Sequence, residues 1–155
     1  MWTAFFLLKE TALINKRQKK RTYVCTIDAS KAFDKINRNN LWGKMIRIFE
    51  PFIVRAFINY YSVSIVFIIV NGSKTGMIKT SRDVKQGGPL SPLLFSIYID
   101  ELGNRLDKGV SRVKIGNIKI NKKLYADDLL LITNNIDEMN RLLNITEEYG
   151  REFEI

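Results

Sequence analysis

Two adjacent aspartates, Asp127 and Asp128, lie between short apolar runs that are typical of β-strands. Neighbouring side chains of a regular strand point to opposite faces, so two carboxylates that serve one site need a tight turn between strands. A third carboxylate, Asp28, ends another strand-like run over residues 22–28. We expect the three to meet at the ends of adjacent strands as a cup of hard oxygen ligands, which suits Mg²⁺. Two such ions hold the attacking and leaving oxygens of a phosphoryl transfer.

The runs around these aspartates predict the strands that position them. Tyr125 ends one strand, residues 129–132 form the second strand of the same hairpin, and residues 22–28 supply a further strand. Residues 29–34 and 86–89 read as loops. Two more hairpins are predicted, one from residues 64–70 and 76–81 around the turn Asn71-Gly72, and one from residues 113–115 and 118–120 around Gly116-Asn117.

Apolar residues at helical spacing predict the covering elements. Helices are expected over residues 3–15, 40–49 and 92–106. Another is expected to begin at Pro51, with an apolar face of Ile53, Phe57, Ile58 and Tyr61. A last helix is expected to begin after an N-cap at Asn135, with Glu138 completing a capping box. We therefore predict an α+β fold, an antiparallel sheet with helices packed on one face. The 155 residues suffice for one domain, 1–155.

Charge and composition narrow the class of partner. The net charge of +9 favours polyanions, nucleic acid first and an anionic membrane second, and a basic globule without such a partner is equally open. One cysteine and no histidine exclude an internal disulfide, histidine zinc sites and Ser-His or Cys-His nucleophiles. The lone cysteine indicates a reducing, intracellular compartment, nuclear or cytoplasmic. No apolar run is long enough to predict a membrane span.

Three segments together resemble the reverse transcriptase family. Residues 26–34 (Thr-Ile-Asp-Ala-Ser-Lys-Ala-Phe-Asp) look like motif A, residues 84–100 look like motif B, and Tyr-Ala-Asp-Asp at 125–128 looks like motif C. The sequences Lys-Ala-Phe-Asp and Pro-Leu-Ser-Pro-Leu-Leu-Phe are similar to the non-LTR retrotransposon branch. Three motifs in the family order are far more specific than a lone Asp-Asp pair. The resemblance implies the palm of a right-hand polymerase, with the end of the fingers and no thumb.

The resemblance also implies roles for the matching residues. The implied catalytic residues are Asp28, Asp127 and Asp128, which with the carbonyl of Ile27 would hold two Mg²⁺ ions, or Mn²⁺ as an alternative. The implied nucleotide-binding residues are Ala29, Ser30, Lys31, Ala32, Phe33, Gln86 and Gly87, of which Phe33 would exclude a 2′-hydroxyl. The implied nucleic-acid contacts are Tyr125, Lys85 and Arg82. Taken singly, each of these residues is as well explained by a strand end, a turn, a core aromatic or a solvated charge.

The activity implied is RNA-directed DNA polymerisation, with an RNA template, a DNA primer and deoxynucleoside triphosphates as partners. Two alternatives stay open: a non-catalytic relic that keeps the fold and binds nucleic acid, and a group II intron maturase. Because the chain covers mainly the palm, we expect it to polymerise little or not at all by itself. Three features depart from the family pattern. Asn37-Arg38 stands where many relatives have histidine, Arg82-Asp83 stands where glycine is usual before motif B, and Gly88 replaces the small cysteine common in non-LTR members.

Overall fold

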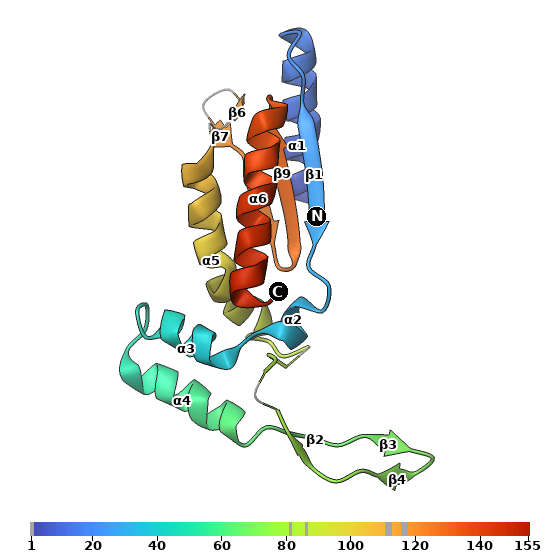
Figure 1. The fold of residues 1–155 in the computed structure, drawn as a ribbon, viewed down its shortest axis with the longest axis vertical. Coiled ribbons are helices and arrows are strands. Elements are labelled where there is room, and N and C mark those ends of the chain that lie inside the picture. Colours follow the sequence, from blue (N-terminus) through green and yellow to red (C-terminus); the bar gives the residue numbers. More distant parts are fainter. Residues whose placement is uncertain (1, 81, 86, 111–112, 116–117) are drawn as a thin grey trace. The chain divides into compact units, whose positions relative to one another are not determined.

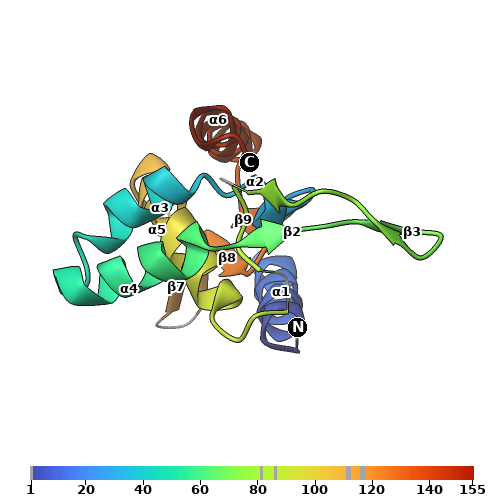
Figure 2. The same cartoon turned by 90° about the horizontal axis from the view of Figure 1, so that it is seen from below.

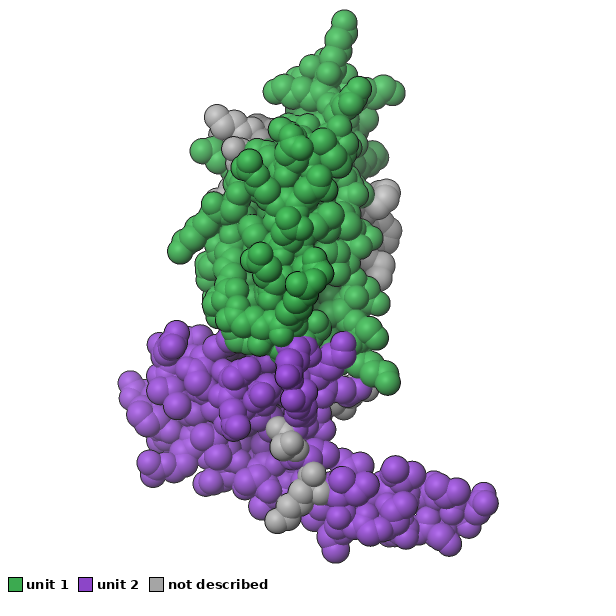
Figure 3. All heavy atoms as spheres, viewed as in Figure 1, with its two compact units in different colours: residues 1–32, 99–153, 155 green, residues 33–98, 154 purple. Residues whose placement is uncertain are grey.

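The computed structural model of the chain describes residues 2–80, 82–85, 87–110, 113–115 and 118–155. The chain forms two compact units (Figure 3). The first unit comprises Met1–Ala32, Ile99–Phe153 and Ile155, and the second comprises Phe33–Tyr98 and Glu154. Each unit is described by itself below. Over the described residues, no helix has the length and apolar character needed to cross a bilayer.

An antiparallel sheet of three strands in the order β1-β9-β8 forms the centre of the first unit (Figure 1). Its strands are β1 (Tyr23–Asp28), β9 (Asp128–Thr133) and β8 (Lys122–Tyr125). The β1–β9 ladder runs from the pair Tyr23–Thr133 to the pair Asp28–Asp128. The predicted α+β class, the antiparallel sheet and the hairpin after Tyr125 are confirmed.

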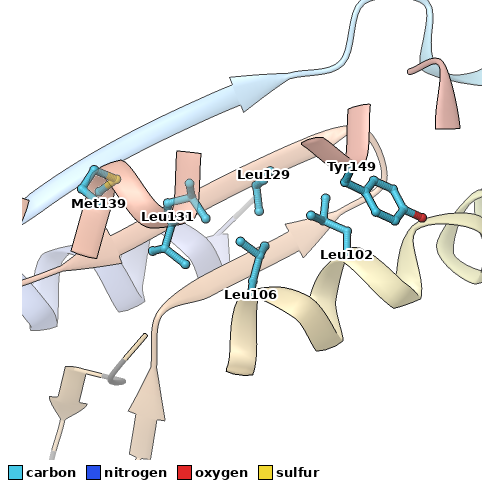
Figure 4. Close-up of a cluster of buried hydrophobic side chains, with 7 residues drawn as sticks. Leu102, Leu106, Leu129, Leu131, Met139 and Tyr149 are labelled. Carbon is cyan, nitrogen blue, oxygen red and sulfur yellow. The ribbon is translucent and has the colours of Figure 1, made fainter. Parts of the chain in front are cut away.

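Alternation along β9 divides its side chains between two cores. Leu129 and Leu131 pack on one face, against α5 (Ser91–Gly109) and α6 (Ile136–Phe153). Figure 4 shows these two leucines beside Leu102 and Leu106 of α5 and Met139 and Tyr149 of α6. Leu142 of α6 completes the fully buried set.

The opposite face of the sheet is covered by α1 (Trp2–Arg17). Leu130 and Ile132 pack there with Val113 of β6, and Leu8 of α1 lies against them. Figure 2 shows α6 and α1 on opposite sides of β8 and β9. Thus α5 and α6 share one face, as predicted, and α1 adds a layer on the other. The hairpin of β6 (Val113–Ile115) and β7 (Ile118–Ile120) is present as predicted, and its predicted turn, 116–117, lies outside the described residues.

A short chain of hydrogen bonds joins the end of β9 to the start of α6. Asn135 caps the helix as predicted, since its Oδ1 accepts the N–H of Asp137 at 2.8 Å. The second part of the predicted capping box, a direct hydrogen bond from the N–H of Asn135 to the Glu138 side chain, is wrong. The N–H of Asn135 donates to the Thr133 hydroxyl at 3.2 Å, and that hydroxyl donates to Glu138 at 2.7 Å. Thr133 thus occupies the place that Glu138 would take in a direct box.

Among its described residues, the second unit contains three short helices, a long hairpin and the first part of α5, up to Tyr98. The helices are α2 (Ala32–Lys35, which begins on the last residue of the first unit), α3 (Arg38–Met45) and α4 (Pro51–Ser62). The predicted loop 29–34 therefore runs into a short helix. The helix predicted over 40–49 ends at Met45. Pro51 begins α4 as expected, but Val54 and Tyr61 are its buried residues, and Ile58 is 39% exposed.

The predicted hairpin of residues 64–81 is interrupted. Its strands are β2 (Ile65–Val66) with β5 (Ile78–Lys79), and β3 (Ile69–Val70) with β4 (Ser73–Lys74). Asn71 and Gly72 have φ of 49° and 80°, as a type I′ turn requires. Side chains from Ile65 to Val70, which alternate between the two faces, are all at least 42% exposed. The apolar run is therefore exposed on both faces and does not form the uninterrupted strand that was predicted.

Candidate active site

Asp28 and Asp128 form the last pair of the β1–β9 ladder, and both are exposed. The N–H of Ala29 donates to the carbonyl of Asp127 at 3.3 Å. Because hydrogen-bonded and non-hydrogen-bonded pairs alternate along an antiparallel ladder, Asp28 and Asp128 form a pair of the narrow, non-hydrogen-bonded kind. Side chains of such pairs lie on the same face and approach each other most closely. Two carboxylates from distant parts of the chain therefore share one exposed end of the sheet.

Asp127 lies in the two-residue turn, Ala126-Asp127, that joins β8 to β9. The pair Tyr125–Asp128 closes this turn. Ala126 has a φ of 50°, a left-handed conformation that costs an L-residue about 1–2 kcal/mol. A positive φ at the first turn residue is a feature of type II′ hairpins, which usually place glycine there. The turn thus keeps Asp127 directly beside Asp128 at the cost of local backbone strain.

These residues fit a hard divalent cation in donor type, because carboxylate and carbonyl oxygens are the ligands that Mg²⁺ prefers. Among the described residues, no three carboxylate or thiol side chains are gathered as a ready metal site. The backbone brings the three predicted aspartates to one end of the sheet, and their side chains do not converge there. The predicted ligand role of the Ile27 carbonyl stays a prediction, and the Ile27 side chain packs against the core on the α6 side.

The loop after β1 is a tight turn. The N–H of Ala32 donates to the carbonyl of Ala29 at 3.2 Å, and Lys31 has a φ of 55°. Of the four amide groups predicted to approach a triphosphate, those of Ala29 and Ala32 are therefore used in internal hydrogen bonds. Within the described chain, the N–H groups of Ser30 and Lys31 donate to no backbone carbonyl outside helices and strands. These two amides and the exposed Lys31 side chain are the donors that the loop offers to a ligand.

Tyr125 also belongs to the first unit and is 65% exposed. It pairs with Asp128, so its side chain lies on the same face of the sheet as Asp28 and Asp128. The remaining predicted residues belong to the second unit. Gln86 lies outside the described residues.

Phe33 is half-buried, and its ring lies 5.1 Å from that of Phe95 with a tilt of 40°. Its carbonyl accepts the N–H of Val84 at 3.0 Å, which ties α2 to the segment before Gly87. Gly87 is exposed, with a φ of 76° that favours glycine. The ring of Phe33 is thus fixed by packing within its own unit.

The two predicted phosphate contacts of this unit already have partners. The Nζ of Lys85 donates to the hydroxyl of Tyr60 at 3.0 Å. The exposed Arg82 pairs with Glu154 at 2.5 Å. Ion pairs between exposed side chains contribute about 0–1 kcal/mol, so Arg82 can exchange this partner for a phosphate.

Sequence reasoning did not assign a role to Arg38, which is buried at the centre of the second unit. Its guanidinium donates to the carbonyl of Thr80 at 2.6 Å and to that of Asp83 at 3.0 Å, and it pairs with the Asp83 carboxylate. It also lies 4.9 Å from the ring centre of Tyr61. Asp83 has a φ of 95°, where glycine is favoured. Two residues at departures from the family pattern, Arg38 and Asp83, therefore contact each other.

Comparison with known proteins identifies the family of the chain. The family described as Reverse transcriptase (RNA-dependent DNA polymerase) matches residues 3–155. The chain belongs to the reverse transcriptase family. The resemblance predicted from the three motifs is confirmed.

The relatives of this reverse transcriptase chain include polyproteins of non-LTR R2 elements. It is 35% identical over 137 residues to a retrovirus-related Pol polyprotein from the type-1 retrotransposable element R2 of Popillia japonica, covering 83% of this chain and 19% of that protein. It is 29% identical over 131 residues to the R2DM Pol polyprotein of Drosophila melanogaster, covering 82% of this chain and 12% of the relative. The chain thus spans less than a fifth of the length of either relative.

The fold is shared with telomerases. Apo telomerase from Candida tropicalis, truncated from the C-terminal domain, matches with a TM-score of 0.69 and 16% identity, over 96% of this chain and 32% of that one. Telomerase from Candida albicans, in complex with a fragment of telomeric RNA, matches with a TM-score of 0.68 and 11% identity, over 97% of this chain and 28% of that one. At such low identity the likeness concerns the fold alone.

Proposed function

We propose that residues 1–155 are the palm core, with the end of the fingers, of an RNA-directed DNA polymerase from a non-LTR retroelement. The observation that carries the proposal is the facing pair Asp28–Asp128 with Asp127 in the adjacent turn. Membership of the reverse transcriptase family supports it. The substrates are deoxynucleoside triphosphates, a DNA primer and an RNA template, and the reaction takes place in the nucleus or cytoplasm.

In the proposed reaction, the primer 3′-oxygen forms a bond to the α-phosphorus of the triphosphate. The bond from that phosphorus to the bridging oxygen breaks, pyrophosphate leaves, and the hydroxyl proton is lost. When bound, two Mg²⁺ ions supply positive charge that favours the ionised hydroxyl and offsets charge on the transferred phosphate. Asp28 and Asp127 hold them, with the carbonyl of Ile27 as a further ligand and Asp128 more peripheral.

The other residues bind the substrates and select the incoming nucleotide. The amides of Ser30 and Lys31 and the Lys31 side chain bind triphosphate oxygens. Phe33 lies against the incoming sugar and excludes a 2′-hydroxyl, and Gln86 and Gly87 lie along the nascent base pair. Tyr125, Lys85 and Arg82 contact nucleic acid, the two cations through phosphates.

The non-catalytic relic and the intron maturase remain the rival proposals. The ion pair between Arg38 and Asp83 stabilises the fold, which the relic also keeps, so primer extension decides between enzyme and relic. A maturase requires a splicing activity in addition to polymerisation, and RNA splicing assays separate it from a retroelement enzyme.

Primer extension on an RNA template tests the proposal. The assay compares the 155-residue chain with a longer polypeptide extended at both ends, each as wild type and as Asp127→Ala, with Glu148→Gln as an exposed carboxylate control. We expect Mg²⁺-dependent synthesis by the longer wild type and the control, little by the short chain, and none by Asp127→Ala. If the longer wild-type polypeptide is folded but extends no primer, the relic is favoured. Robust synthesis by the short chain contradicts the expectation that the palm alone cannot hold its substrates.

A further inference from the structure

The second unit contains a pocket of about 250 Å³ between α4 and the loop 85–91. One wall is aromatic, made by Phe57, Tyr60 and Tyr61 of α4, and the other is made by Gly88, Pro89 and Leu90. Ala56 of α4, the exposed Lys85 and the buried Ser91 complete the lining. None of the α4 residues was assigned a role by the motifs of the family.

The loop wall of this pocket is held by its own hydrogen bonds. The N–H of Gly88 donates to the Lys85 carbonyl at 2.9 Å, and the N–H of Ser91 donates to the Gly88 carbonyl at 3.1 Å. The hydroxyl of Ser91 also donates to the Lys85 carbonyl. A Cβ on Gly88 would lie 2.8 Å from that hydroxyl oxygen and 3.0 Å from the Lys85 carbonyl oxygen, so a larger residue would shift this closure. This side of the pocket is therefore largely preformed.

The aromatic wall of the pocket is also held in place, by contacts between its rings and their neighbours. Tyr60 contacts Tyr61 edge to face, with ring centres 5.2 Å apart. Tyr61 is buried, with the Trp42 ring 5.7 Å away on α3 and the Arg38 guanidinium 4.9 Å from its ring centre. Tyr60 itself is 55% exposed, so one ring of the braced pair is available to a ligand.

The size and chemistry of the pocket indicate its ligand. Pockets for drug-sized ligands enclose about 300–1,000 Å³, so this one suits a single ring system. Aromatic walls favour a flat ligand that stacks. The Nζ of Lys85 lies over the Tyr60 ring, 4.1 Å from its centre, which places a cation directly at the aromatic wall. A ligand that joins one flat ring to an anionic group matches both features.

We propose that this pocket receives one unpaired base of a single-stranded nucleic acid, while Lys85 binds an adjoining phosphate. Sequence-tolerant binding of single strands combines base stacking on aromatic side chains with cations along the backbone. The net charge of +9 favours this polyanion over a protein partner. The inference rests on the proposed function, which supplies the nucleic acid.

Photocrosslinking tests where the base lies. A single-stranded RNA of about 10 nucleotides, within the usual site size, carries 5-iodouridine at one position and is irradiated with the 155-residue chain. We expect the crosslinked peptide to contain Tyr60. Crosslinks confined to peptides outside α4 and the loop 85–91, or the absence of any crosslink, overturn the proposal.

Equilibrium binding tests what the pocket contributes. Tyr60→Ala removes the stacking ring and Ala56→Leu fills the pocket, and each is expected to weaken binding of the RNA about 5–100-fold in fluorescence anisotropy. Phe52→Ala is the matched control, since Phe52 lies on α4 outside the pocket lining and is 72% exposed. Lys85→Ala is expected to reduce the slope of log affinity against log salt by about 0.7, the value for one phosphate contact with a single strand.

An abasic oligonucleotide separates base binding from phosphate binding. Tyr60→Ala should leave its affinity unchanged if the ring stacks on a base. If the pocket variants bind the RNA as the control does, with circular dichroism showing all variants folded, the proposal is wrong. Primer extension by the longer polypeptide then decides the proposed function independently, because it needs no occupied pocket.

Discussion

Asp28 and Asp128 face each other across the β1–β9 ladder as a pair without connecting hydrogen bonds. Like charges directly opposite on neighbouring strands destabilise a sheet by roughly 0.2–1 kcal/mol. Nothing in the local fold needs two acidic side chains there, because the two residues end their strands and are exposed. The pair is thus a stability cost that a bound cation would remove, which links the stability of the free protein to its proposed chemistry.

Removal of one charge from this pair should therefore stabilise the protein in the absence of metal. We expect Asp128→Asn to raise the free energy of unfolding by about 0.5 kcal/mol, which corresponds to about 1–2 °C in melting temperature for a chain of this size. Thermal denaturation in EDTA, followed by circular dichroism, measures the shift. Glu148→Gln on the exposed side of α6 is the matched control and should change the melting temperature little.

Mg²⁺ should stabilise the wild type more than either aspartate variant. Millimolar Mg²⁺ is expected to raise the melting temperature of the wild type, because a ligand that binds only the folded state stabilises it. The increase should be smaller for Asp128→Asn and absent for Asp28→Asn. Equal increases in all three proteins would show that Mg²⁺ binds elsewhere.

The turn residue Ala126 offers a second test, since its φ is 50°. Glycine removes a conformational penalty of about 1–2 kcal/mol and loses about 0.4–1 kcal/mol through the unfolded chain. We expect Ala126→Gly to stabilise the protein by about 0.5–1 kcal/mol in urea denaturation. The same substitution at Ala12, exposed within α1, should destabilise by about 1 kcal/mol. Destabilisation at both sites would contradict the strained turn.

Patterns that repeat along the chain predicted most of the first unit. A short apolar run identified β9, and helical spacing identified the helix over residues 92–106, in which Leu102 and Leu106 are buried. The turn at Asp127 followed from the need to bring two adjacent carboxylates to one site. Each of these inferences depends on neighbours in sequence, whose relation is set by the geometry of a strand or helix.

Contacts between distant residues could not be predicted in this way. Arg38 binds Thr80 and Asp83, more than 40 residues away, and no periodicity marks such a pair. The apolar run 64–70 was predicted as one strand, but its side chains are exposed on both faces and only four of its residues pair as β2 and β3. Thr133 enters the α6 cap from the preceding strand, which the motif for a direct capping box does not contain.

Phe33 provides a test of substrate selection. Its ring is held against Phe95, so Phe33→Ala should open space at the incoming sugar. We expect the ratio of kcat/KM for deoxynucleotides over ribonucleotides to fall by about tenfold or more in primer extension by the longer polypeptide. Phe33→Tyr keeps the ring and should keep the selection. An unchanged ratio for active Phe33→Ala would show that another group excludes the 2′-hydroxyl.

Arg38 and Asp83 provide the last test, because the ion pair and the positive φ of Asp83 can be removed separately. Arg38→Ala leaves the partly exposed Asp83 carboxylate and several carbonyls without their donor, and we expect a loss of about 1–3 kcal/mol in the free energy of unfolding. Asp83→Ala removes the carboxylate and keeps the strained φ of 95°. Asp83→Gly removes both, so it should be about 1 kcal/mol more stable than Asp83→Ala.

Urea denaturation of the three variants measures these differences. Gly76→Ala is the control for a change of glycine content, since a Cβ at Gly76 would meet no atom within 4 Å. If Asp83→Gly is as unstable as Asp83→Ala, the positive φ carries no cost, and the carboxylate alone explains why aspartate replaces the usual glycine. If the free energy of unfolding of Asp83→Gly approaches that of the wild type, carbonyl oxygens are sufficient hydrogen-bond partners for Arg38. Aspartate and glycine are then two alternatives that stabilise this turn equally.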